Sequence, residues 1–142
     1  SAHFREPWKI YWLTKEEKQK VVTMMKDYVE RTNTSDSSIL KTASVLEQAS
    51  TLLLVFNTSQ EDLTMDLLSI GAMMENMCLK ATDLQVASLW VGNPLFVKKE
   101  ICSFFSVPAS WQLVGGLALG YSEHIPSTLA RKTLEEVLRR EH

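Results

Sequence analysis

Apolar residues recur along the chain with two different periods, and these periods predict its helices and strands. A period of three to four residues follows Thr14, a residue type that caps helices, and fades at residues 31–38, a polar stretch expected to form a loop. A short helix is expected over residues 39–48. The longest helical pattern covers residues 61–84 and follows Ser59, the expected cap.

Four apolar runs of strand length are interspersed with these helices and are rich in β-branched and aromatic residues. They are expected at residues 10–13, 51–56, 86–91 and 111–120. The second run is continuously apolar, which is typical of a strand covered on both faces. A further helix is expected over residues 96–105. This mixture, without any internal repeat, predicts one domain of mixed α and β structure.

The longest helix has more apolar surface than one side of a helix can hold. One stripe comprises Leu63, Leu67, Ile70, Met74, Cys78 and Ala81, and a second comprises Leu68, Ala72, Met73 and Leu79. A helix that is apolar nearly all round has to pack against protein on most sides. A second copy of the chain would cover the surplus in a homodimer, and the alternative is a central core helix in a monomer.

Composition and charge give no support to several classes of function, among them nucleic-acid binding and membrane insertion. Of the 142 residues, 45% are hydrophobic and 23% are charged, as in an average globular domain. A net charge of −2 gives no reason to expect nucleic acid or an anionic membrane. No apolar run approaches the roughly 18 to 20 residues that span a bilayer, so a cytoplasmic protein is expected.

Common catalytic and metal-binding patterns are absent from the sequence. There is no Ser-His-Asp order, no paired-histidine spacing and no Cys-x-x-Cys motif, so hydrolytic and metal functions rank low. Cys78 and Cys102 lie in apolar segments and are expected to be buried thiols and not a disulfide. Gly115 and Gly116 lie in the middle of an expected strand, so they do not form a phosphate-binding loop.

The order of four short segments along the chain is its most informative feature. Residues 1–8 (Ser-Ala-His-Phe-Arg-Glu-Pro-Trp) are similar to the Ser-x-x-Asn-x-Gln-Pro-Trp segment of the nitroreductase family of flavoenzymes, and closer to a branch of that family with Gln or Glu before Pro-Trp. The end of the long helix (residues 74–81), residues 87–92 and residues 113–121 continue the resemblance. Family members usually begin with a helical, Arg-rich segment that grips the FMN phosphate. That segment is missing here, so residues 1–142 are expected to be a single nitroreductase-like domain and a fragment.

The resemblance implies a fold and an activity. The fold would be α+β, with a central mixed, mostly antiparallel sheet flanked by helices, in a dimer with a long buried interface helix. The activity would be that of an FMN-dependent oxidoreductase, passing electrons from NADH or NADPH through the flavin to a small organic acceptor such as a nitroaromatic or quinone. Such a protein positions and tunes its flavin and supplies no catalytic acid or nucleophile of its own.

The resemblance also assigns cofactor contacts to three segments. They are Ser1, Ala2, His3 and Glu6 in the N-terminal loop, Trp90, Val91 and Gly92 beside the flavin ring, and Arg131 and Lys132 near the phosphate. The last two lie in a segment similar to the family's Arg-x-x-Leu-Glu-Glu-Val arm, within residues 128–140, expected to be a helix or an extended arm. Glycine permits close backbone approach, and a guanidinium can bind phosphate with two hydrogen bonds. Each segment also has a simpler interpretation. The N-terminal loop would then be an exposed chain end, residues 90–92 a strand that ends in a glycine turn, and Arg131 and Lys132 the solvated start of a basic helix.

Some residues depart from the family pattern. Phe4 stands where many members have a flavin-contacting Asn, and Arg5 is expected to pair with Glu6 or with solvent. Gln85 replaces a glycine that normally takes a left-handed conformation, so either Gln85 adopts that conformation with strain or the turn differs. Asn76 is expected to be a buried hydrogen-bonding residue. Two further alternatives are a non-catalytic flavin- or nucleotide-binding protein and a partner-binding protein on the same scaffold.

Overall fold

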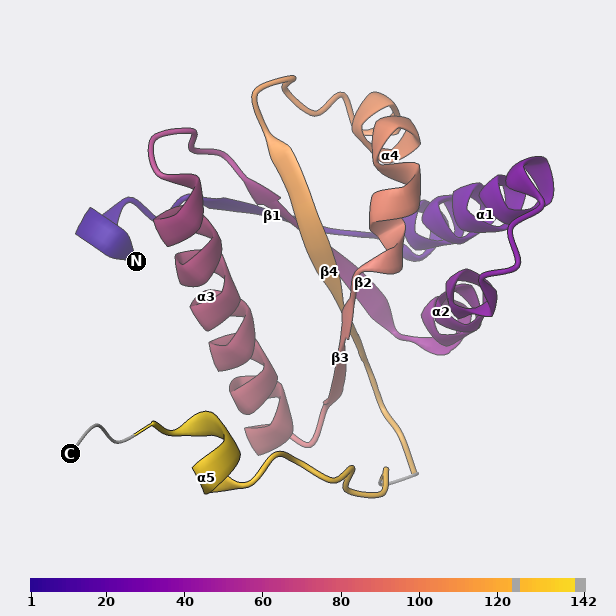
Figure 1. Cartoon of the computed structure of the whole chain (residues 1–142). Helices are drawn as coiled ribbons and strands as arrows, with labels where there is room; N and C mark the ends of the chain where they lie inside the picture. Colours follow the sequence, from indigo (N-terminus) through magenta and orange to yellow (C-terminus); the bar gives the residue numbers. More distant parts are fainter. Residues whose placement is uncertain (124–125, 140–142) are drawn as a thin grey trace.

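The computed structural model describes residues 1–123 and 126–139. A four-stranded sheet lies at its centre, with helices on both faces and a C-terminal arm that leaves the sheet (Figure 1). In chain order the elements are η1 (Ala2–Phe4), β1 (Trp8–Trp12), α1 (Lys15–Thr32), α2 (Ser37–Gln48), β2 (Thr51–Asn57), α3 (Leu63–Asp83), β3 (Ala87–Val91), η2 (Asn93–Val97), α4 (Lys98–Phe104), β4 (Gln112–Gly120) and α5 (Leu134–Val137).

The strands lie in the order β1-β2-β4-β3, and the sheet pairs every described strand antiparallel to its neighbour. The four predicted strands are therefore confirmed, whereas the expected parallel component of a mixed sheet is not found in the described part of the chain. β1 begins two residues earlier than predicted, because Trp8 already pairs with Asn57. The predicted burial of the second run is confirmed, since six of the seven residues of β2 are buried.

One face of the sheet is covered by α1, α2, η2 and α4. Side chains at alternate positions of β2, including Leu54 and Phe56, pack there with Met25 and Ile39. Alternation along a strand sends Val55 to the other face. The sheet therefore separates a large core from a smaller one.

Local hydrogen bonds explain where α1 begins and how it meets α2. The Thr14 hydroxyl accepts from the Glu17 amide at 3.2 Å, and the Glu17 carboxylate accepts from the Thr14 amide at 2.7 Å, so the predicted cap is confirmed. Lys18 is buried, and its Nζ donates to the backbone carbonyls of Glu47 and Ala49 at the end of α2. Burial, together with the charge of Lys15, lowers the pKa of Lys18.

Of the described helices, α3 alone covers the other face of the sheet. Ile70 and Met74 pack on Val55, and Ala81 is buried further along the helix. The outer side of α3 is open: Leu68 is 62% exposed and Leu79 is 61% exposed. Apart from η1 near its N-terminal end, no other described element lies over that side of the helix. The alternative of a central helix enclosed by the core of a monomer is therefore not found in the described residues, and burial of this side by a second copy stays a prediction.

The beginning of α3 also differs from the prediction. Asp62, not Ser59, is the N-cap, and its carboxylate accepts from the Met65 amide at 3.1 Å. Ser59 instead accepts from the Glu61 amide at 3.2 Å, within the preceding turn. A capping signature at either residue fits the same apolar pattern, so periodicity alone could not choose between them.

Several single-residue expectations can be compared with the structure. Gln85 has a φ of 58°, so the expected left-handed conformation is confirmed. Asn76 is exposed, and its prediction as a buried residue is wrong, because it lies on the uncovered side of α3. Cys78 and Cys102 are free thiols as expected, but both are half-buried, so their predicted burial is wrong. None of the described helices is long and apolar enough to cross a bilayer.

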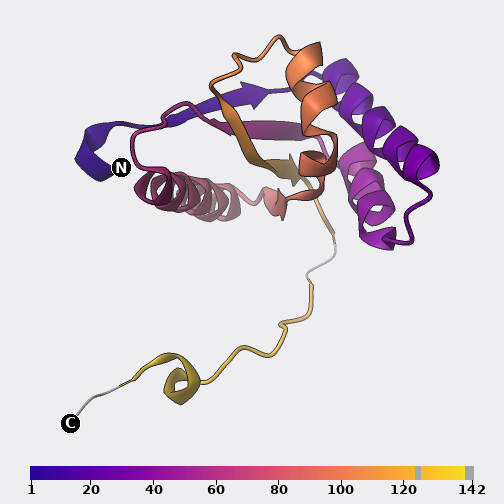
Figure 2. The same cartoon turned by 45° about the horizontal axis from the view of Figure 1, so that its top comes forward.

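The C-terminal arm follows β4. Figure 2 shows it leading away from the sheet and ending near the single turn of α5. The predicted segment at residues 128–140 is thus mostly extended within its described part, and Arg140 lies outside the described residues. The described residues of the arm, 126–139, are exposed.

Candidate functional site

A hollow of about 610 Å³ lies between the N-terminal loop and the outer side of α3. We call it the α3 groove. The loop contributes Ser1 and Ala2, and Trp8 lines it from β1. From α3 it is lined by Met65, Leu68, Ser69, Ala72, Met73, Asn76 and Met77. The walls are apolar with a few hydroxyl and amide groups, which is the usual lining of a site for a planar organic ligand.

The N-terminal loop has an unusual backbone. His3, Phe4 and Glu6 have φ values of 53°, 55° and 46°, a region that residues other than glycine adopt uncommonly. Local bonds maintain this shape: the Glu6 amide donates to the Ser1 hydroxyl at 3.0 Å, and the Ala2 amide donates to the Ser69 hydroxyl on α3 at 3.1 Å. The side chains of His3, Phe4 and Glu6 are exposed, so of the four predicted loop contacts only Ser1 and Ala2 line the groove.

An ion pair that sequence reasoning missed joins this loop to α3. Arg5 donates to Oδ1 of Asp66 through Nη2 at 3.0 Å and Nε at 3.3 Å. The Asp66 side chain is 1% exposed and that of Arg5 is 20% exposed. The expectation that Arg5 pairs with Glu6 or with solvent is therefore wrong. The available signal was the four-residue spacing of Asp66, Ile70 and Met74, which places a carboxylate on the buried stripe.

The surroundings of Asp66 keep it ionised. Burial raises the pKa of the carboxyl, but the Ser59 hydroxyl and the Arg5 guanidinium lower it more, so the net pKa lies below the ordinary value. Oδ2 of Asp66 has no hydrogen-bond partner among the described residues, and the hydrogen bonds that its carboxylate accepts from a side chain come from Arg5. The Arg5 fork is therefore the principal partner of this buried charge.

The second predicted segment lies at the end of β3. The Trp90 indole donates to the Cys78 sulfur at 3.2 Å, and Val91 is buried in the core. A Cβ atom added to Gly92 would meet no described atom within 4 Å. Gly92 also has an ordinary φ of −95°, so neither its conformation nor crowding within the described chain requires glycine. The space beside its backbone is open to a ligand or another chain.

The structure does not bring the predicted contacts together within one chain. η1 and the N terminus lie on one side of α3, and β3 with η2 lies on the other side (Figures 1 and 2). A hollow of about 540 Å³ is lined by residues that include Leu67, Leu95 and Lys98, but none of the predicted contacts lines it. Arg131 and Lys132 lie on the exposed arm.

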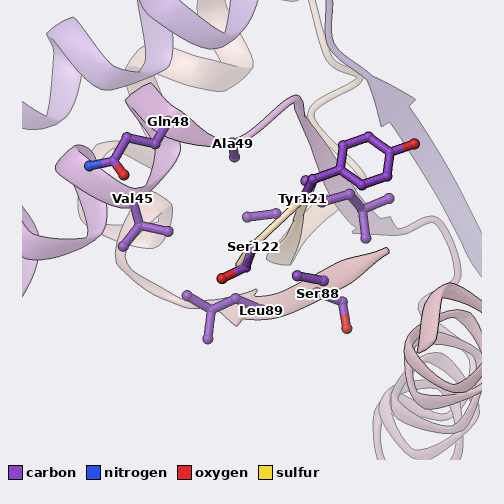
Figure 3. A pocket seen from close by; sticks show the side chains of 11 residues that line it. Val45, Gln48, Ala49, Ser88, Leu89, Tyr121 and Ser122 are labelled. Atoms are coloured by element: carbon purple, nitrogen blue, oxygen red, sulfur yellow. The ribbon is translucent and has the colours of Figure 1, made fainter. Parts of the chain in front are cut away.

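A third hollow, of about 210 Å³, lies where α2 ends beside the outer ends of β3 and β4. Figure 3 shows Val45 of α2 above Leu89 of β3, with Ser122 beside them. Among the described residues that line it, none is a predicted cofactor contact. The α3 groove and the open space at Gly92 are therefore the better candidates.

The chain matches the model of the nitroreductase family over residues 1–121. The matched part includes the N-terminal loop and the end of β3, and it stops before Arg131 and Lys132.

Solved structures share the fold at low sequence identity. Nitroreductase A from Vibrio parahaemolyticus superposes with a TM-score of 0.80 at 14% identity, over 100% of this chain and 60% of that one. A putative nitroreductase from Desulfovibrio desulfuricans, solved in complex with FMN, has a TM-score of 0.73 at 18% identity, over 95% of this chain and 72% of that one. The NADPH:FMN oxidoreductase of Vibrio harveyi, complexed with NAD⁺, has a TM-score of 0.77 at 14% identity, over 100% of this chain and 61% of that one.

These matches confirm the expected α+β architecture, in which an antiparallel sheet carries helices on both faces. The chain spans 60% of the length of the Vibrio parahaemolyticus protein. With the family model matched over residues 1–121 of 142, the chain belongs to the nitroreductase family.

Proposed function

We propose that this chain forms an FMN-dependent oxidoreductase of nitroreductase type. It would accept reducing equivalents from NADH or NADPH and deliver them to a small organic acceptor, such as a nitroaromatic or a quinone. The family match over residues 1–121 is the observation that carries this proposal. Related folds have been solved with FMN, including nitroreductases from Desulfitobacterium hafniense and Bacteroides fragilis.

The residues that line the α3 groove suit a flavin. The α3 groove has apolar walls for a planar ring, and Ser1, Ser69 and Asn76 offer polar groups at its surface. The open space beside Gly92 leaves its backbone free to approach a ring edge. FMN, when bound, would supply the hydride-accepting chemistry. The lining of the groove contains no titratable side chain among its described residues, so the protein's part is to bind, orient and exclude water.

We further infer that the working form is a homodimer. The outer side of α3 exposes Leu63, Met65, Leu68 and Leu79, each at least 44% accessible. Exposed apolar patches of this kind mark association surfaces. In one chain, α3 separates the N-terminal loop from the end of β3. A second copy packed on α3 would bring one protomer's loop toward its partner's β3 end, with FMN at the seam.

The remaining assignments stay proposals. Ser1, Ala2, His3 and Glu6 would contact the flavin from the loop, and Trp90, Val91 and Gly92 would contact it from β3. Arg131 and Lys132 would reach the phosphate from the arm. A single nitroreductase-like domain over residues 1–142 and a cytoplasmic location are predictions from the sequence alone.

One observation favours a second candidate, a flavin-binding protein without turnover. Phe4 replaces the flavin-contacting Asn of many family members, and its side chain is 93% exposed, so it supplies no polar contact to the ring.

Absorbance spectroscopy separates these functions. The purified chain, saturated with FMN and freed of excess, is titrated anaerobically with NADH or NADPH, and then with a quinone. Bleaching of the flavin band followed by its return on adding the quinone supports the oxidoreductase. A yellow protein that neither nucleotide bleaches supports the flavin binder. A colourless dimer that ignores added FMN contradicts both and supports a partner-binding protein.

A further inference from the structure

The N-terminal loop adopts a conformation that short-range forces do not favour. Three of its non-glycine residues, His3, Phe4 and Glu6, have positive φ angles. Such conformations persist only where surrounding contacts hold them, and they gather at binding sites. The loop forms one wall of the α3 groove through Ser1 and Ala2. Whatever holds the loop therefore shapes the groove.

Two contacts join the loop to α3. One is the single hydrogen bond from the Ala2 amide to the Ser69 hydroxyl at 3.1 Å. The other is the Arg5 fork on Asp66, with two nitrogens within 3.3 Å of one carboxylate oxygen. Asp66 lies on the side of α3 that packs against the sheet, so its position is set by a rigid element. A buried charge is costly unless it is paired, which favours the arrangement that keeps Arg5 in place.

The pair is not needed to begin β1. The Thr58 amide donates to the Pro7 carbonyl at 3.0 Å, and Trp8 already pairs with Asn57 in the sheet. The backbone from Pro7 onward is thus fixed by the sheet itself. The Arg5–Asp66 pair therefore holds only the residues before Pro7, and these residues form the wall of the α3 groove.

We propose that Arg5 and Asp66 are positioning residues, a latch that holds the Ser1–Glu6 loop on α3 in the conformation that receives FMN. The inference rests on the proposed function, because it assigns the loop to the flavin. Arg5 acts through the loop backbone and does not itself touch the cofactor. Breaking either side of the latch should therefore have the same result.

The test compares Arg5→Met, Asp66→Asn, the double variant and Arg5→Lys, which retains the charge without the planar fork. Arg31→Met is the matched control, because it removes another 3.0 Å Arg–carboxylate pair, with Glu100, that joins α1 to α4 away from the loop. Two quantities are measured in the full chain. They are the hydrogen-exchange rates of amides 2–6 in FMN-free protein and the FMN dissociation constant from flavin fluorescence.

Both single variants should speed exchange in the loop by about tenfold or more. Both should weaken FMN binding by about tenfold or more, because a displaced wall misplaces the ligand. The double variant should be no worse than either single variant, since they break one interaction. Arg5→Lys should fall between Arg5→Met and wild type, and Arg31→Met should match wild type in both measurements.

Unchanged loop exchange in Arg5→Met would overturn the latch, and this variant keeps the test valid if Asp66→Asn fails to fold. Weaker FMN binding in Arg5→Met with wild-type binding in Asp66→Asn would also overturn it, because Arg5 would then contact FMN directly. Wild-type protein that does not bind FMN contradicts the proposed function, and with it the role of the loop in receiving FMN. Hydrogen exchange would then still decide whether the pair holds the loop.

Discussion

The indole of Trp90 lies against α3 at Gly71 and donates to the sulfur of Cys78 at 3.2 Å. These contacts join the edge strand β3 to α3 across the turn between them. A Cβ atom on Gly71 would lie 3.9 Å from the Trp90 ring, which is an ordinary contact distance. Gly71 is therefore not required by crowding.

Gly71→Ala should be neutral or should raise the free energy of unfolding by about 0.5 to 1 kcal/mol, because alanine restricts the unfolded chain and favours a helix interior. Gly116→Ala is the matched comparison: its Cβ would lie 2.8 Å from the Leu53 carbonyl oxygen. Overpacking there should lower the free energy of unfolding by about 1 to 3 kcal/mol. Urea titrations of both variants measure the difference. A destabilised Gly71→Ala would show that Trp90 tolerates no added methyl group.

The ionisation of Asp66 should contribute to acid unfolding. Its pKa is lowered in the folded state, so folded protein with a charged Asp66 is favoured above the ordinary value of 3.8. Ionised Asp66 therefore adds to the free energy of unfolding above pH 3.8, and this added stability is lost as the pH falls through the folded-state pKa. Between pH 5 and pH 2, the free energy of unfolding should therefore fall less in Asp66→Asn than in wild type. Urea titrations at a series of pH values measure this fall. A steeper loss in the variant would contradict the lowered pKa.

Charge on the outer side of α3 should prevent association. Leu68→Glu is expected to convert a dimer into a monomer, because a carboxylate would be buried without a partner at the proposed interface. Leu40→Glu is the control, since Leu40 is also exposed but lies on α2. Sedimentation velocity at micromolar concentration gives the oligomeric state, and circular dichroism checks the fold. A wild-type chain that sediments as a monomer would refute the homodimer.

Arg131 should act on the phosphate group of FMN and not on its ring. Arg131→Met is expected to weaken FMN binding by about tenfold, because charge-assisted hydrogen bonds to phosphate are strong. Lys132→Met should have a smaller effect, since an ammonium lacks the planar fork. Riboflavin, which has no phosphate, should bind both variants as it binds wild type. An equal loss for riboflavin would assign Arg131 to the ring or to the fold.

The elements were predictable because their signals are local. Thr14 and Glu17 form their cap within one turn, and β2 is an uninterrupted apolar run, so short windows of sequence were sufficient. The resemblance also predicted the groove residues Ser1 and Ala2. It did not predict the loop's backbone, where His3 and Phe4 take positive φ angles without being glycine.

By itself, the sequence determined the order and type of the elements, the family and the excess apolar surface of α3. Only the tertiary structure decided the strand order β1-β2-β4-β3, the pairing of Arg5 with Asp66 across 61 positions, and the separation of the loop from β3 by α3. The physical reason is range: helix periods and caps act over a few residues, whereas strand order and buried ion pairs depend on which distant surfaces pack together.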